Sequence, residues 1–427
     1  MSIPELYQVF LEHPSVQTDT RKIKEGDIFF ALKGPNFNGN LFARKALELG
    51  ASYCVCDEIT DIKDERILMT DNVTVTLQQL AKYHREQFTI PFIAITGSNG
   101  KTTTKELVHA VLSKKYKCYT TAGNLNNHIG IPLTILSVNS DAQIAVIEMG
   151  ANHLHEIEGY CKYTLPTHGL ITNCGKAHLE GFGSEEGVRK AKGELYDYIA
   201  AGGGTVFINN DYGYLADISR AVKNKISYGS EDADFTGIAG SGDHFLTVEI
   251  TNGADINSIQ TKLAGNYNLS NVLSAVCIGK TFGVADDEIK AALENYTPSN
   301  NRSQIIKRGT NTFLLDAYNA NPSSMKVAIE NFAAMQAEKK VVILGGMMEL
   351  GKDSTAEHNT LIDLVQSYEW DSVAVTGKDF TDLPGNILRF NSAEEIAAWF
   401  REQHFENTAI LIKGSRSMAM EKISEQF

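Results

Sequence analysis

The chain has 427 residues, of which 43% are hydrophobic and 21% are charged, as is typical of a globular enzyme of two or three domains. Its formal net charge of −13 argues against nucleic acid or an anionic membrane surface as the main partner. No apolar run approaches the roughly 20 residues that a membrane span needs, and no signal peptide opens the chain, so we expect a cytoplasmic protein.

Residues 1–90 are predicted to form a first domain of short strands and helices. Segments 27–33 and 53–56 are rich in β-branched, aromatic and other apolar residues, which favours strands. Segments 41–49 and 77–87 have the apolar spacing of helices, and the second of these helices leads towards the next domain.

The most informative segment is TGSNGKTT, residues 96–103, which follows the apolar run 91–95 and precedes a helix predicted over 106–114. A strand, a glycine turn and a helix N-terminus together form a site for a polyphosphate. The glycines let backbone N–H groups approach phosphate oxygens, and the helix dipole favours the negative charge. The sequence therefore predicts a nucleotide site here, with an ordinary loop as the alternative.

Within this loop, Lys101 would neutralise the β- and γ-phosphates and the Thr102 hydroxyl would hold Mg²⁺. The loop departs from the general G-x-x-x-x-G-K-[ST] pattern because Ile95 stands where that pattern has glycine. This departure argues against a standard motor ATPase or regulatory GTPase and indicates a shorter glycine signature.

Residues 91–300 are predicted to form a second domain around a largely parallel, doubly wound sheet, since buried strands alternate with helical segments. The tract 226–262 breaks this rhythm and is predicted to form short antiparallel strands, after which 267–282 is a helix. The buried strand candidates of this domain are 144–149, 169–172 and 205–208.

Residues 301–427 are predicted to form a third, Rossmann-like α/β domain. Its Gly345-Gly346 pair lacks a G-x-G-x-x-G fingerprint, so we do not infer a dinucleotide. Its strand candidates are 312–316, 340–344, 372–376 and 408–412.

Polar residues at two strand ends are candidates for metal binding, because the carboxyl ends of strands in such a sheet open onto the nucleotide crevice. Glu148 ends one apolar run and is our candidate for a Mg²⁺ ligand beside Thr102, with a solvated acid as the alternative. His178 lies in the polar loop after the next strand and could present its imidazole to a second metal ion, or be structural.

The stretch Asn152-His-Leu-His-Glu156 is expected to open the next helix with Asn152 as its cap, and a transition-metal site is the alternative. Lys190 and Lys192 lie on a predicted helix, where both would normally be solvated. If one of these lysines enters the site, it must contact phosphate or lose its charge, for example by reacting with CO₂ to give a carbamate. The sequence does not select between these options.

Two further pairs of residues are candidates for nucleotide contacts. Asn268 and Asn271 lie three positions apart at a helix start, where their amides could hydrogen-bond a nucleotide or serve as caps. Arg302 and Asp316 stand at the start of the third domain and could close over ATP from the far side of a cleft.

The order of these motifs resembles the Mur ligase superfamily of ATP-dependent amide-bond-forming enzymes, and the resemblance covers nearly the whole chain. The TGSNGKTTTK loop is similar to the phosphate loop of that family. The other motifs that carry the resemblance are residues 124–132, 148–153, 177–184, 191–194, 316–324 and 413–417.

The resemblance implies three domains: 1–90 for the UDP end of a substrate, 91–300 for ATP, and 301–427 as a domain that closes on ligands. It implies an ADP-forming ligase that uses ATP and Mg²⁺ and acts as a monomer in peptidoglycan precursor synthesis. The branch with these motifs joins D-alanyl-D-alanine to the terminal carboxylate of a UDP-N-acetylmuramoyl-tripeptide through an acyl phosphate. The alternatives are a sister ligase for another amino acid, a folylpolyglutamate synthase, or a non-catalytic nucleotide switch.

The resemblance also assigns roles to residues. It implies that Lys101, His178 and Lys192 are catalytic, with Lys192 carbamylated, and that segments 18–21 and 32–34 contact the UDP substrate. His128 stands where the family often has an acidic residue, so the role of this position is left open. The implied metal ligands are Thr102, Glu148, His178 and Lys192, and the implied nucleotide contacts are Gly97, Ser98, Asn99, Gly100, Lys101, Thr102, Thr103, Asn127, Asn268, Asn271, Arg302 and Asp316.

Overall fold

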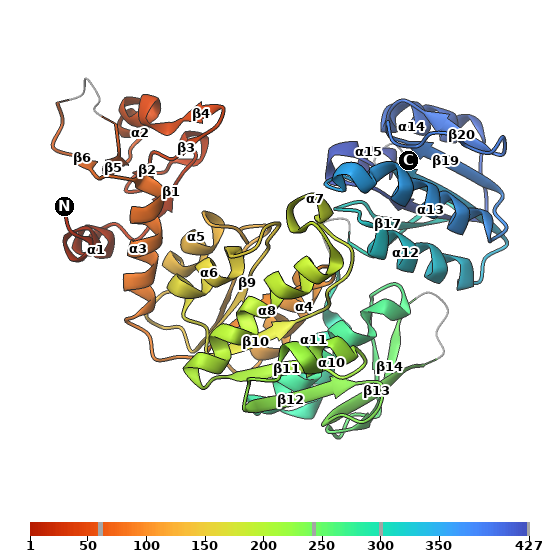
Figure 1. The fold of residues 1–427 in the computed structure, drawn as a ribbon, viewed down its shortest axis with the longest axis horizontal. Coiled ribbons are helices and arrows are strands. Elements are labelled where there is room, and N and C mark those ends of the chain that lie inside the picture. Colours follow the sequence, from red (N-terminus) through yellow and green to blue (C-terminus); the bar gives the residue numbers. More distant parts are fainter. Residues whose placement is uncertain (59–62, 241–244, 299–301, 425–427) are drawn as a thin grey trace.

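The computed structural model describes residues 1–58, 63–240, 245–298 and 302–424, so the predicted boundary between residues 300 and 301 lies outside the described residues. The predicted α/β class is confirmed, because sheets of four, nine and six strands follow one another along the chain, each with helices beside it (Figure 1). No helix in the described ranges is both long and apolar enough to cross a membrane.

The N-terminal sheet is parallel throughout and has the order β1-β2-β5-β6. The predicted strand at 27–33 is shorter than expected, since β2 ends at Phe30 and residues 33–38 form the separate hairpin β3–β4. The bounds are α1 (Ile3–Glu12), β1 (Val16–Gln17), β2 (Ile28–Phe30), β3 (Lys33–Gly34), β4 (Phe37–Asn38), α2 (Ala43–Glu48), β5 (Tyr53–Cys56), β6 (Ile67–Met69) and α3 (Val73–Arg85).

The central sheet is doubly wound, as predicted, and β7 (Phe92–Thr96) shows why. Alternate side chains of this fully buried strand enter two separate cores. Phe92 and Ala94 pack among helices α3, α5, α6 and α8, while Ile93 and Ile95 pack against α4 and α10. The bounds of these helices are α4 (Lys101–Leu112), α5 (Gly130–Leu136), α6 (Glu156–Thr164), α8 (Glu185–Gly202) and α10 (Leu269–Thr281).

The strand order of the central sheet is β15-β14-β13-β12-β11-β10-β7-β9-β8. The antiparallel prediction for 226–262 is confirmed for the β13–β14 and β14–β15 pairs, and it is wrong for β12, which is parallel to both β11 and β13. The strand bounds are β8 (Cys118–Thr120), β9 (Ile144–Glu148), β10 (His168–Ile171), β11 (Thr205–Asn209), β12 (Asn224–Gly229), β13 (Phe235–Gly240), β14 (Thr247–Asn252) and β15 (Ser258–Gln260). The remaining helices are α7 (Leu179–Phe182), α9 (Gly213–Ile218) and α11 (Asp286–Asn295).

The C-terminal sheet has the order β16-β17-β21-β18-β19-β20, with only β16 antiparallel to its neighbour. All four predicted strands are present, whereas β16 and β20 were not predicted. The bounds are β16 (Gln304–Arg308), β17 (Asn311–Asp316), α12 (Pro322–Ala334), β18 (Lys339–Gly345), α13 (Ser354–Gln366), β19 (Ser372–Thr376), β20 (Ile387–Phe390), α14 (Ala393–Glu402), β21 (Thr408–Lys413) and α15 (Glu421–Ser424).

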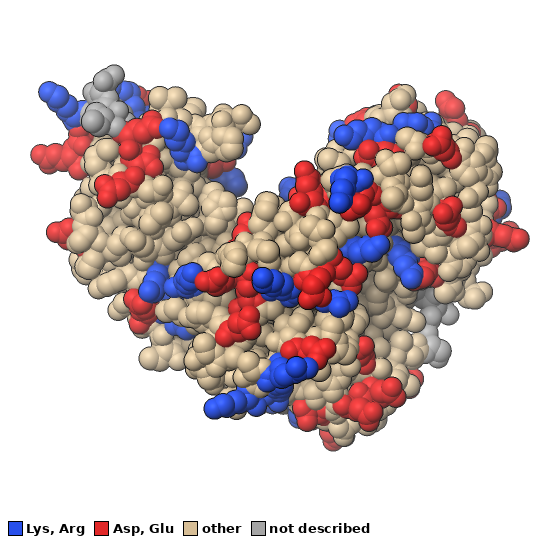
Figure 2. Space-filling model, viewed as in Figure 1, with Lys and Arg blue, Asp and Glu red and all other residues tan. Residues whose placement is uncertain are grey.

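The three sheets are arranged so that the N-terminal sheet and the C-terminal domain stand on either side of the central domain (Figure 1). Figure 2 shows a wide notch between them and a mixture of acidic and basic side chains on this face. The C-terminal domain lies close to α7 and to the loops at the carboxyl end of β7 and β10, where the predicted site residues gather.

Candidate active site

The phosphate loop joins β7 to α4, and α4 begins at Lys101 rather than at the predicted residue 106. Gly100 ends the turn in a left-handed conformation (φ 80°), and a Cβ there would lie 2.7 Å from the Asn271 side-chain oxygen. The early start places Lys101, Thr102 and Thr103 in the first helical turn. The N–H groups of a first turn have no partner within the helix, which suits a phosphate.

The shape of the loop is fixed by the segment after β10. The Ser98 N–H donates to the Asn173 carbonyl (2.8 Å), and the Asn99 N–H donates to the Asn173 side-chain oxygen (3.0 Å). Gly97 has φ 143°, and a Cβ there would lie 2.0 Å from the Thr172 hydroxyl oxygen, so no other residue fits without displacement. Contacts within the protein therefore hold the turn in this shape.

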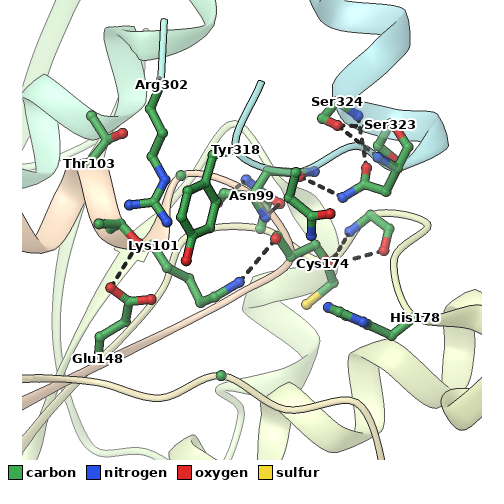
Figure 3. A pocket seen from close by; sticks show the side chains of 18 of the residues that line it. Asn99, Lys101, Thr103, Glu148, Cys174, His178, Arg302, Tyr318, Ser323 and Ser324 are labelled. Carbon is green, nitrogen blue, oxygen red and sulfur yellow. Dashed lines mark hydrogen bonds between the residues drawn. The ribbon is translucent and has the colours of Figure 1, made fainter. Parts of the chain in front are cut away.

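Lys101 lies over this turn and donates from Nζ to the carbonyl oxygens of Gly97 (2.6 Å) and Ser98 (3.0 Å). Burial lowers the pKa of Lys101, while the negative charge of Glu148 opposes that shift. Figure 3 shows the lysine on the wall of the cleft with Glu148 beside it.

Glu148 ends β9, which neighbours β7 in the sheet, and its carboxylate is almost wholly buried. Its two oxygens accept hydrogen bonds from the Thr102 hydroxyl (2.8 Å) and from the Asn126 amide (2.7 Å). Hydroxyl and carboxylate oxygens side by side form a donor set that suits Mg²⁺. The two residues predicted to share a metal ion are thus brought together.

The amide beside Glu148 belongs to Asn126, for which the sequence predicts no role, while its neighbour Asn127 is the implied nucleotide contact. Asn127 is exposed, and its side-chain oxygen accepts the N–H groups of Ile129 (3.1 Å) and Gly130 (2.9 Å) at the start of α5. Asn127 still lines the cleft.

Of the two candidate lysines on α8, Lys190 is exposed and Lys192 is buried. Lys192 Nζ donates to the Ala151 carbonyl (3.1 Å) and lies 5.0 Å from the centre of the Phe182 ring. Burial, helped by the charge of Lys101, lowers the pKa of Lys192 to about 7. A substantial fraction of this amine is therefore neutral near pH 7, directly behind the cleft wall formed by Ala151.

The prediction that Asn152 caps the next helix is wrong. Helix α6 begins at Glu156, and His155 precedes it in a left-handed conformation (φ 68°). The Glu156 carboxylate accepts the N–H groups of Asn152 (2.7 Å) and His153 (2.9 Å) and so orders the turn from the helix side. Among the described residues, no cluster of three or more His, Cys, Asp or Glu side chains is placed to hold a metal ion.

His178 lines the cleft and contacts the C-terminal domain, because its Nδ1 lies 2.5 Å from a carboxylate oxygen of Glu349. This neighbour lowers the pKa of Glu349. The backbone N–H of Glu180 also donates to the Glu349 carbonyl (3.1 Å). The loop that carries the predicted second-metal histidine is therefore also a docking point between two domains.

Asn268 and Asn271 form a buried chain of amides on the other side of the loop. Asn271 donates to Asn268 (2.8 Å), Asn268 donates to the Ala264 carbonyl (2.8 Å), and Asn271 accepts from the Thr104 hydroxyl (3.0 Å). Neither side chain caps the helix, since the Asn268 side chain at the N-cap position of α10 makes no capping bond. Both residues line the cleft.

The C-terminal domain supplies the facing wall. Arg302 stacks on Tyr318 with its Cζ 3.5 Å from the ring centre, as Figure 3 shows, and the carboxylate of Asp316 pairs with the buried Lys413. Lys413 belongs to the sequence motif 413–417, which by itself predicts no role for the lysine. The parallel pairing of β17 with β21 puts Asp316 opposite Lys413, a long-range contact without a local signal.

These walls enclose a cleft of about 690 Å³. Gly97 and Lys192 lie just behind its surface, and the proposed UDP-substrate segments 18–21 and 32–34 lie on the N-terminal domain, outside its lining. The predicted site residues that line it are Ser98, Asn99, Gly100, Lys101, Thr102, Thr103, Asn127, Glu148, His178, Asn268, Asn271, Arg302 and Asp316.

Comparison with known families gives three consecutive matches. Residues 14–96 match the Mur ligase family catalytic domain, 95–279 match the Mur ligase middle domain, and 301–424 match the Mur ligase glutamate ligase domain. A curated relative at 35% identity spans 96% of this chain. The chain belongs to the Mur ligase family.

That relative is the UDP-N-acetylmuramoyl-tripeptide–D-alanyl-D-alanine ligase of Escherichia coli (strain K12), of which 92% is covered. The ligase of the same name from Bacillus subtilis (strain 168) is 31% identical over 96% of this chain and 92% of its own length. The alignments therefore run through all three domains of these relatives.

Solved structures agree in fold. A crystal structure of MurF from Acinetobacter baumannii matches with a TM-score of 0.90 and 28% identity, covering 99% of this chain and 98% of that one. MurF ligase from Thermotoga maritima in complex with ADP matches with a TM-score of 0.88 and 26% identity over 98% and 97% of the two chains. A folylpolyglutamate synthase from Mycobacterium tuberculosis, 14% identical with a TM-score of 0.62, shares the fold alone.

Proposed function

We propose that this protein is an ATP-dependent, ADP-forming ligase that joins D-alanyl-D-alanine to the terminal carboxylate of a UDP-N-acetylmuramoyl-tripeptide in peptidoglycan precursor synthesis. The observation that carries the proposal is the cleft in which the phosphate loop and the Thr102–Glu148 pair face Arg302 and Asp316. The name of the E. coli relative supplies the substrates, and its alignment spans nearly both chains. We further propose that the enzyme acts in the cytoplasm and as a monomer.

In this proposal each of three regions of the chain has its own role in binding. Residues 1–90 bind the UDP end of the tripeptide substrate, 91–300 bind ATP, and 301–427 close over the ligands. Segments 18–21 and 32–34 would contact the UDP substrate from the N-terminal region. The nucleotide would lie between the phosphate loop and the wall formed by Asn268, Asn271, Arg302 and Asp316.

In the first step, the tripeptide carboxylate attacks the γ-phosphorus of ATP and ADP leaves, which gives an acyl phosphate. Lys101 and the first-turn N–H groups of α4 hold the phosphate oxygens in line and stabilise their charge. The oxygens of Thr102 and Glu148 would hold Mg²⁺, which would supply further positive charge against the β- and γ-phosphates.

In the second step, the neutral amine of the dipeptide attacks the acyl carbon, and the tetrahedral intermediate collapses to an amide and inorganic phosphate. A closed cleft protects the acyl phosphate from water. Lys192 is placed to carry a carbamate, since its partly neutral amine can attack CO₂ and lose a proton. The carbamate oxygens and His178 would then face a second metal ion, as the family resemblance implies.

A phosphate-release assay tests the proposal. We expect the purified protein, with ATP and Mg²⁺, to release phosphate and form a UDP-linked pentapeptide only when both the UDP-tripeptide and D-alanyl-D-alanine are present. Lys101→Ala should lower kcat by at least about 1,000-fold through lost transition-state stabilisation. Turnover with glutamate and a folate would favour a folylpolyglutamate synthase, and ATP binding without turnover would favour a nucleotide switch.

A further inference from the structure

The dipeptide acceptor in the proposed reaction carries a free carboxylate at the end opposite its reacting amine. Two extended residues span at most roughly 7 Å, so this carboxylate lies up to about that distance from the reacting amine, on the side away from the phosphate centre. It enters a protein with a net charge of −13, beside a triphosphate. A cation near that end of the dipeptide would offset the repulsion from these negative charges.

Most cations around the cleft already have partners. Lys413 is buried against Asp316, and Lys176 is paired with Glu357 at 2.7 Å. Lys101 lies over the phosphate loop, and the amine of Lys192 is partly neutral. In the proposed function Lys101 binds the phosphates and Lys192 carries a carbamate, while Lys176 and Lys413 form ion pairs. None of these four lysines is available for the dipeptide carboxylate.

Arg416 differs from all of them. Its side chain is exposed, and within the described ranges it forms no salt bridge. Its Cζ lies 5.5 Å from the centre of the Tyr318 ring, and Tyr318 lines the cleft. A guanidinium group next to an aromatic ring can still donate its coplanar N–H groups to a carboxylate.

The backbone holds Arg416 beside Tyr318, which lines the cleft. Asp316 and Lys413 end neighbouring parallel strands, so the segments that follow them leave the same edge of the sheet. Ser415, which is buried, accepts the Met348 N–H (3.1 Å) and contacts the Ala320 carbonyl (3.5 Å). The backbone at Arg416 is therefore fixed by the buried Ser415 that precedes it.

We propose that Arg416 binds the C-terminal carboxylate of the acceptor dipeptide and thereby selects acceptors with a free carboxylate. The proposal rests on the proposed ligase function. A bidentate contact from the guanidinium group would also fix the direction in which the amine approaches the acyl phosphate. Arg302, closer to the same ring at 3.5 Å, remains on the nucleotide side.

The test compares D-alanyl-D-alanine with its C-terminal amide as acceptors for the full-length protein. We expect the parent to prefer the carboxylate by about 10- to 100-fold in kcat/KM, as a charged hydrogen bond provides. Arg416→Ala should lose this preference through a higher KM for the dipeptide, while the KM values for ATP and the UDP-tripeptide stay unchanged. Arg416→Lys should recover part of the preference for the carboxylate, because lysine keeps the positive charge but lacks the paired N–H donors of the guanidinium group.

Arg401→Ala is the matched control, since Arg401 is an exposed arginine on α14 of the same domain. It should keep the full preference. An Arg416→Ala enzyme that retains the preference, loses activity equally with both acceptors, or shows a raised KM for ATP instead would overturn the proposal. A parent protein that ligates neither acceptor would refute the ligase function itself, and this inference with it.

Discussion

Lys190 and Lys192 lie two positions apart on α8 but differ in burial, which decides whether the amine can react. Lys190 is exposed, whereas Lys192 is buried beside Phe182 and its pKa is lowered to about 7. Only a neutral amine attacks CO₂, so a carbamate should form at Lys192 and not at Lys190.

This expectation can be checked by ¹³C NMR of the protein in buffer with ¹³C-labelled bicarbonate. The parent should show one carbamate carbonyl signal that survives in Lys190→Arg and disappears in Lys192→Arg. Activity should fall by at least about 100-fold in Lys192→Arg, because the positive charge then returns close to Lys101. A signal of equal intensity in all three proteins would contradict the assignment.

Site residues could be predicted from the sequence where they belong to a short local motif. Lys101 and Thr102 follow from the glycine turn, and Glu148 from its place at a strand end. The contact of Asn126 with Glu148 marks the limit, since the sequence offers no local signal for it. Long-range pairs such as Asp316 with Lys413 have no sequence signal of their own.

At the scale of the elements, the turn between β7 and α4 depends on Gly97. Gly97→Ala would place a Cβ 2.0 Å from the Thr172 hydroxyl oxygen at a φ of 143°. We expect this substitution to distort the turn, to cost about 1–3 kcal/mol of stability and to weaken ATP binding by at least about 10-fold. Calorimetric ATP titration and thermal unfolding measure both effects.

Gly202→Ala is the control for this change, because Gly202 ends α8 and a Cβ there meets nothing within 4 Å. It should stabilise the protein by about 0.5–1 kcal/mol and leave ATP binding unaltered. Equal ATP affinity in the two alanine variants would show that the turn tolerates a side chain.

Element type could be predicted well from hydrophobic pattern, but element ends and strand direction could not. Helix α4 starts five residues before the predicted position because Thr102 to Thr104 find partners in distant segments, which outweighs their weak helix propensity. Strands β12 and β13 are parallel although only residues 230–234 separate them, so a short connection did not reveal the strand direction. Of these two errors, only the start of α4 concerns contacts that are distant in sequence.

His168 at the start of β10 gives the central sheet a pH dependence. Its ring lies between Phe207 (6.0 Å) and Phe282 (5.2 Å), and burial lowers the pKa of His168 to about 4. The unfolded chain binds a proton near pH 6.5 while the folded chain does not, so folding stability falls as pH drops from about 6.5 to 4. The loss is at most about 1.4 kcal/mol per pH unit.

Thermal unfolding at about pH 7.5 and about pH 5 tests this dependence. His168→Phe keeps the aromatic contacts without the proton site, so its unfolding midpoint should fall less than that of the parent at the lower pH. His404→Asn is the control, because His404 is exposed at a left-handed position that asparagine tolerates. Identical pH profiles for the parent and His168→Phe would exclude the assignment.

At the scale of the whole molecule, three domains could be predicted from the alternation of strands and helices, but their docking could not. The Asn321 amide donates to the Asn99 side chain (2.8 Å), and so connects the N-cap of α12 with the phosphate loop. His178 contacts Glu349 across the same junction. Such contacts join residues more than 150 positions apart, and each residue alone is an ordinary polar side chain.

The Lys176–Glu357 pair offers a direct test of this docking. The pair spans the junction at 2.7 Å, with side-chain exposures of 47% and 14%, and the Lys176 N–H also donates to the Ser323 hydroxyl (2.9 Å). Lys176→Glu would set two carboxylates against each other and favour separation of the C-terminal domain from the central loops. Because ATP lies between these domains in the proposed function, kcat/KM for ATP should fall about 10-fold.

Small-angle X-ray scattering with a non-hydrolysable ATP analogue should give a larger radius of gyration for Lys176→Glu than for the parent. The double variant Lys176→Glu, Glu357→Lys restores opposite charges and should recover both the compact shape and most of the activity. Arg220→Glu makes the same change of charge at an exposed position of the central domain, paired only locally with Asp217, and should alter neither quantity. If the double variant is no better than the single one, this ion pair does not control docking, and the contacts of Asn99 and His178 must hold the domains together.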